Sequence, residues 1–111
     1  MEFDKLDPEF KAKWTAALRS GEYFQARGAL KAIESPRIRH CCLGVACEVL
    51  YPELLREYPN GAPGTVPEDE FAPKVLHAVG LTSPAQHKLV SLNDSYRNTF
   101  SEIADWIDAN L

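Results

Sequence analysis

The side chains best suited to covalent chemistry are three cysteines near the middle of the 111-residue chain. Cys41 and Cys42 directly follow His40, and Cys47 comes soon after them. A nucleophilic thiol needs a lowered pKa, which a nearby base, a cation or a helix N-terminus can provide. Cys41 and Cys42 lie after a basic segment, where a helix would begin, so an enzyme that uses either thiol is one hypothesis. The alternative is that these small side chains only fill the core, as we expect of Cys47.

The same residues match a metal site poorly. Structural zinc is held by four Cys or His ligands in paired short spacings. The chain has no C-x-x-C, and His77 and His87 belong to no ligand motif. We therefore expect neither a metal nor a cofactor. Three cysteines, two of them adjacent, also favour reduced thiols over a disulfide framework.

A second group of polar residues could bind an anion. Arg27 stands beside Gly28 in a basic segment, and this pairing lets a guanidinium and backbone N–H groups converge on a phosphate or carboxylate. Asn93 and Asp94 fall in a turn that could meet this segment over the start of the central helix, where the helix dipole also favours an anion. We therefore predict a site for a nucleotide-like ligand. Its residues would be Gln25, Arg27, Gly28, Cys41, Cys42, Asn93 and Asp94.

Each of these polar turns also has a structural explanation. Arg27 could be a solvated loop arginine, and Asn93 and Asp94 could simply close a turn, as Asx residues do. Arg27 could also pair with Asp94 and join the two turns without any ligand. The residues alone leave these alternatives open.

The charge distribution limits the class of partner. The net charge is −4, which argues against general nucleic-acid binding. Residues 1–50 carry eight Lys and Arg against seven Asp and Glu, whereas residues 51–111 carry four against nine, so a local anion site is possible in the basic segment of the first part. No stretch approaches the ~20 apolar residues of a membrane span, and the N-terminus lacks a signal-peptide pattern. We expect a cytoplasmic protein.

The apolar spacing predicts the elements that position these residues. A helix should begin at Asp7 and Pro8 and end at Gly21, and the central helix should begin near Cys42. Capping boxes at 83–86 and 99–102 predict two more helices, with Asp105 and Asp108 of the last one in solvent. The pattern also predicts a helix over 71–80, a loop over 59–67, and short strands over 29–33 and 38–41. The fold should therefore be mainly α, with four or five short helices and a small β-hairpin before the central cysteine helix, in a single domain over residues 1–111.

Several motifs occur in an order that is familiar as a whole. They include Trp14, Ala17–Tyr23, Gln25, Gly28–Leu30, Cys41–Val45, Cys47, Leu92–Asp94 and Phe100–Asp105. In this order the chain resembles a family of small uncharacterised bacteriophage and prophage proteins, with a short segment between the cysteine helix and the C-terminal half. The resemblance implies a phage accessory protein that acts non-enzymatically by binding. Counter-defence is the implied role, either blocking a host or defence protein or sequestering a nucleotide immune signal. The oligomeric state is left open.

Overall fold

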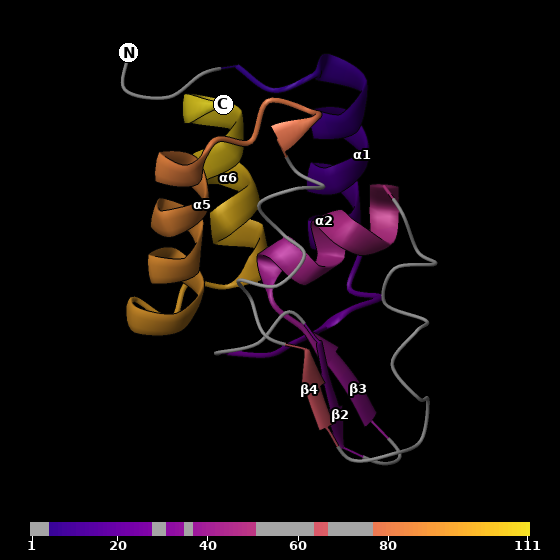
Figure 1. Cartoon of the computed structure of the whole chain (residues 1–111). Helices are drawn as coiled ribbons and strands as arrows, with labels where there is room; N and C mark the ends of the chain where they lie inside the picture. Colours follow the sequence, from indigo (N-terminus) through magenta and orange to yellow (C-terminus); the bar gives the residue numbers. More distant parts are fainter. Residues whose placement is uncertain (1–4, 28–30, 35–36, 51–63, 67–76) are drawn as a thin grey trace.

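A group of helices carries a small β-sheet at one end (Figure 1). The computed structural model describes residues 5–27, 31–34, 37–50, 64–66 and 77–111. Its elements, in chain order, are α1 (Pro8–Arg19), β1 (Phe24–Gln25), β2 (Lys31–Glu34), β3 (Arg37–His40), α2 (Cys42–Leu50), β4 (Gly64–Val66), α5 (Ser83–Val90), the π-helical segment η1 (Ser91–Ser95) and α6 (Phe100–Asn110). The mainly α class is confirmed. Among the described residues, no helix is long and apolar enough to cross a membrane.

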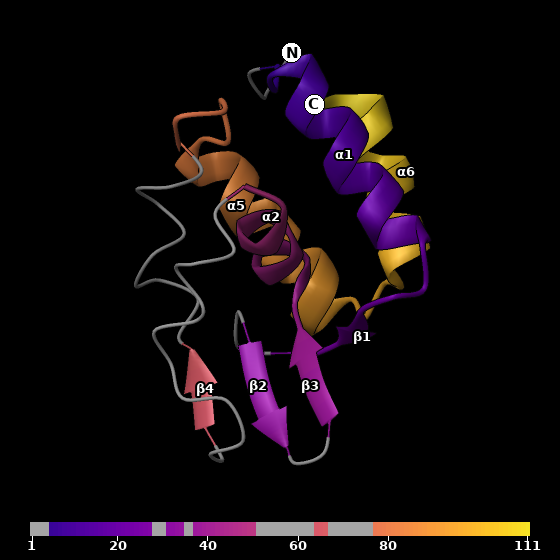
Figure 2. The ribbon, with the colours of Figure 1, turned by 90° about the vertical axis from the view of Figure 1, so that its right-hand side faces the viewer.

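The sheet contains the predicted hairpin and two further strands. Its order is β1-β3-β2-β4, with β2 antiparallel to both β3 and β4, and β1 parallel to β3. Both views show it extending beyond the helices, and the chain passes from β3 directly into α2 (Figure 2). The loop prediction was wrong for Gly64–Val66, because this strand is defined by pairing with distant β2 and not by its own composition. Residues 29–30, 59–63, 67 and 71–76 of the predicted elements lie outside the described part of the chain.

Local signals determine both ends of α1. The Asp7 side chain accepts a hydrogen bond from the Phe10 N–H at 3.0 Å, and Pro8 occupies the first helical position. After Arg19 the chain reverses at Gly21, whose φ of +80° is a conformation that glycine adopts readily. The predicted boundaries of this helix are confirmed.

The central helix α2 is the most buried element. Every residue from Cys42 to Cys47 is buried, as expected of a helix that is apolar nearly all round. Helices α1, α5 and α6 contribute the rest of one continuous core. Trp14 of α1 is itself fully buried, and its indole Nε1 donates to the Cys42 carbonyl at 3.0 Å. This bond fixes α1 against the first turn of α2.

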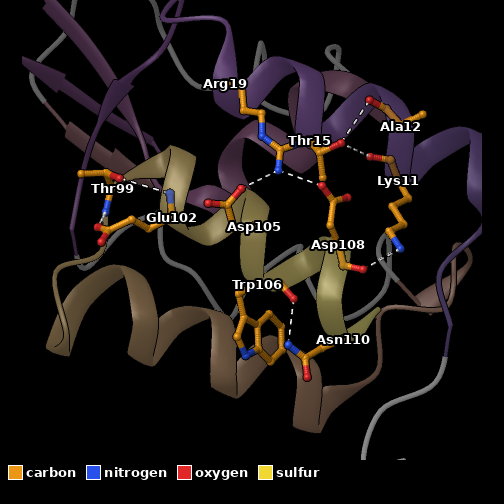
Figure 3. Close-up of polar contacts among 10 residues, drawn as sticks. All are labelled: Lys11, Ala12, Thr15, Arg19, Thr99, Glu102, Asp105, Trp106, Asp108 and Asn110. Carbon is orange, nitrogen blue, oxygen red and sulfur yellow. Dashed lines mark hydrogen bonds and ion pairs between the residues drawn. The ribbon is translucent and has the colours of Figure 1, made fainter.

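The two predicted capping boxes differ in outcome. Thr99 and Glu102 form one in full at the start of α6, with bonds of 2.8 and 3.2 Å (Figure 3). The box predicted at 83–86 was wrong, because Thr82 is the N-cap residue and Ser83 is already helical. Gln86 turns inward instead, and its Nε2 donates to the Leu81 carbonyl at 2.9 Å.

Arg19 joins the surfaces of α1 and α6. Its guanidinium lies 2.8 Å from Asp105 Oδ1 and 2.7 Å from Asp108 Oδ2 (Figure 3). The hydrogen bonds to Asp105 and then Asp108 raise the pKa of Arg19 above its ordinary value. Both carboxylates are partly exposed, as predicted, but they are also paired. Arg19 is therefore engaged at the α1–α6 surface.

The first test of the fold concerns the buried stripe of α6, which consists of Phe100, Ile103, Ala104 and Ile107. Ile103 is fully buried, so Ile103→Ala should lower the free energy of unfolding by about 2–5 kcal/mol through lost packing and an internal cavity. Urea unfolding followed by circular dichroism measures this change. The exposed Ser101→Ala on the same helix is the matched control and should change little. Equal effects of the two substitutions would mean that the stripe does not face the core.

Candidate functional site

Asn93 joins three segments of the chain at the start of α2. Its side chain is fully buried, and its Oδ1 accepts from Gln25 Nε2 at 2.9 Å and from the Cys42 N–H at 3.3 Å. Its Nδ2 donates to the Ala26 carbonyl at 2.8 Å and to Asp94 Oδ1 at 2.7 Å. These four bonds use the whole hydrogen-bonding capacity of an amide side chain. We call these residues, Gln25, Ala26, Cys42, Asn93 and Asp94, the Asn93 cluster.

The π-helical segment places Asn93 in this position. In η1 the backbone N–H of Tyr96 donates to the Ser91 carbonyl at 2.9 Å, five residues back. The wider turn directs Asn93 into the core, whereas Tyr96 at its end lies in solvent. The segment is then closed against β1, because Gln25 Nε2 also donates to the Asn98 carbonyl at 2.8 Å. Single π turns inside helical segments are rare and often occur at functional sites.

The first N–H groups of α2 are largely satisfied within the chain. Cys41 occupies the cap position, where its Sγ accepts from the Gly44 N–H at 3.4 Å and its carbonyl accepts from the Val45 N–H at 3.0 Å. The Cys42 N–H is bound by Asn93. Helix N-termini bind anions through such donors. An anion at this end of α2 would therefore compete with bonds that already exist.

All three thiols are inaccessible to solvent. Cys41, Cys42 and Cys47 each have 0% exposure, and none forms a disulfide. The Cys42 Sγ lies 3.7 Å from the Leu89 carbonyl, its acceptor on α5. Burial, and then the charge of Glu48, raise the pKa of the Cys47 thiol to about 12. A thiol in such surroundings stays protonated and unreactive near neutral pH.

His40 is a buried ionisable group that the sequence did not single out by itself. It is 7% exposed, and within the described residues neither ring nitrogen has a hydrogen-bond partner. Glu48 Oε1 lies 3.6 Å from its Nε2, and the Tyr23 ring packs edge-on at 5.3 Å between centroids. Burial, followed by the charges of Glu48 and Glu22, raises the pKa of Tyr23. His40 ends β3 and Glu48 belongs to α2, so their contact lies at the junction of these two elements.

The structure brings together most of the residues predicted to form a site. Gln25, Asn93, Asp94 and Cys42 meet through the bonds described above, beside Cys41. Arg27 follows this cluster along the chain and is exposed; within the described residues it forms no ion pair with Asp94. Gly28 lies outside the described residues. That these side chains bind a ligand stays a prediction.

Sequence reasoning missed several partners in this region. The carbonyls of Ala26 and Asn98 and the indole of Trp14 complete the network, and backbone acceptors leave no mark in a residue pattern. The exposed Tyr96 and the φ of +54° at Arg97 were also missed. Among the described residues, no group of three or more Cys, His, Asp or Glu could hold a metal ion.

Comparison with known proteins gives one similarity. Residues 6–60 match the family model described as "Domain of unknown function (DUF8296)". The matched region includes α1, the hairpin strands, α2 and all three cysteines, but not Asn93 or α6. No curated protein and no solved structure matches the chain.

The Asn93 cluster should be essential for stability. Asn93→Asp keeps the shape but replaces two donor hydrogens with a carboxylate that faces the Ala26 carbonyl and the Asp94 side chain. We expect the free energy of unfolding to fall by at least about 3 kcal/mol, measured by urea unfolding. Asn98→Asp makes the same chemical change on a half-buried side chain of the same loop and should cost much less. A small effect of Asn93→Asp would show that the cluster is not a structural requirement.

The buried Cys47 predicts a loss of stability at alkaline pH. The unfolded chain releases the thiol proton near the ordinary pKa of 9.0, whereas the folded protein keeps it until about pH 12. The contribution of Cys47 is therefore complete below about pH 9 and is lost as the pH rises toward about 12. Urea unfolding between about pH 8 and about pH 10.5 should show a steeper decline for wild type than for Cys47→Ala. Parallel curves would contradict the raised pKa.

Proposed function

We propose that this protein acts non-enzymatically in the cytosol of the host cell, as a phage counter-defence protein that blocks a host or defence protein by direct contact. The observation that supports the non-enzymatic part of the proposal is the burial of all three thiols together with the internal bonding of the α2 N-terminus. The thiols pack in the core, and the N–H groups at the start of α2 bond to Asn93 and Cys41. The phage origin rests on the resemblance in motif order.

Sequestration of a nucleotide signal is the second candidate, and one observation favours it. The segments that contain Gln25 and Asn93 meet as predicted, with Arg27 exposed at their edge. A phosphate could reach this guanidinium from solvent. Protein contact is preferred because the Asn93 amide has no hydrogen-bonding capacity left for a ligand.

Affinity capture from phage-infected bacteria distinguishes these candidates. The tagged protein should retain a specific bacterial protein, detected by mass spectrometry, and should carry no nucleotide. Calorimetric titration with cyclic dinucleotides and ADP-ribose derivatives should give no heat. Micromolar binding of one of these nucleotides that is lost in Arg27→Ala would establish sequestration instead.

Variants of Cys41 and Cys42 separate both candidates from an enzyme. Cys41→Ser keeps an N-capping side chain in place and should retain biological activity. If Cys41→Ser or Cys42→Ser abolished activity with unchanged stability, and the wild-type thiol were rapidly alkylated by iodoacetamide, the protein would be a cysteine-dependent enzyme.

A further inference from the structure

The end of η1 displays an aromatic ring that contacts one cation and is followed in sequence by another. Tyr96 is 69% exposed, the highest value among the large hydrophobic side chains that the structure describes as exposed. Lys88 Nζ of α5 lies 5.6 Å from the centre of its ring. Arg97, the next residue, is also exposed. We call Lys88, Tyr96 and Arg97 the Tyr96 surface.

The backbone that carries this surface is unusual and firmly held. Arg97 has a φ of +54°, the single positive value at a non-glycine position within the described residues. Such a conformation is disfavoured for a side chain as large as arginine and persists where the surroundings enforce it. Here the Tyr96 N–H donates to Ser91, the Asn98 N–H donates to the Leu92 carbonyl at 2.9 Å, and Gln25 binds the Asn98 carbonyl. Tyr96 and Arg97 are thus held in place on both sides.

We propose that the Tyr96 surface is where this protein docks on an acidic surface of its protein partner. The inference rests on the proposed function and deepens it by naming the surface and the chemistry of the partner. Tyrosine and arginine are the residue types that dominate binding energy at protein interfaces, and a preorganised backbone reduces the entropy lost on binding. A ring that stands 69% in solvent suits a protein surface better than a small ligand, which needs a concave site.

Charge complementarity identifies the partner as acidic. Within the described residues Lys88 and Arg97 form no ion pair, and the exposed Arg27 adds a third cation on the adjoining segment. The carboxylates of the same region keep their charge and are oriented by internal bonds: Asp94 accepts from Asn93, and Glu102 accepts from the Thr99 N–H. The cations Arg27, Lys88 and Arg97 outnumber these two carboxylates. The chain as a whole carries a charge of −4, so it would repel an acidic partner elsewhere. This contrast would orient the partner toward the Tyr96 surface.

Substitution of Arg97 separates binding from folding. Arg97→Gly removes the cation and also relieves the positive φ, so its melting temperature should equal or exceed that of wild type. Capture of the partner from bacterial lysate should nevertheless fall at least tenfold, as it should for Tyr96→Ala. Lys13→Ala removes an exposed cation from α1 and is the matched control, with unchanged capture. Binding of the purified, identified partner should weaken as the salt concentration rises.

Each outcome is informative. Loss of capture in Arg97→Gly and Tyr96→Ala, with retention in Lys13→Ala and weakening by salt, supports the proposal. Equal capture by wild type and all three variants overturns the Tyr96 surface but leaves protein blocking in place. If wild type retains no protein, or retains only a nucleotide, the proposed function itself fails and the docking surface fails with it.

Discussion

The fold depends on satisfying the polar backbone at the buried start of α2. A helix that begins inside the core has N–H groups without helical partners, and leaving them unpaired away from water is costly. Here the Cys42 N–H binds Asn93, the Gly44 N–H binds the Cys41 thiol, and the Cys42 carbonyl receives the Trp14 indole. The partners come from η1, from the helix cap and from α1. One requirement of α2 therefore positions elements that are distant in sequence.

The same requirement explains the unusual segment after α5. The widened turn buries Asn93 while the chain continues to α6, and it leaves Tyr96 and Arg97 at the surface. Gln25 ties this loop to β1 by bonding both Asn93 and the Asn98 carbonyl. The interior of the region is thus bonded within the fold, and its outer side is exposed. This division favours a protein that binds through its surface over one that reacts through its cysteines.

The sequence predicted what local signals specify. The ends of α1 and the start of α6 follow from Asp7, Pro8 and the Thr99–Glu102 box, because each depends on neighbouring residues. Strand β4 and the inward turn of Gln86 depend on distant partners, so composition alone was misleading there. The meeting of Gln25 and Asn93 was anticipated from their polarity. Residue types could not show that the polar groups of Gln25 and Asn93 bond to each other and to backbone groups.

Amide hydrogen exchange at Cys42 tests the central claim most directly. If Asn93 holds the buried start of α2, the Cys42 N–H should exchange only through global unfolding, as slowly as amides in the middle of α6. A helix end that merely frays would exchange far faster than those amides. Exchange of Cys42 at the global rate is the result that we predict. Rapid exchange, while the amide of Ile103 stays protected, would show that the Asn93 cluster does not hold the fold together.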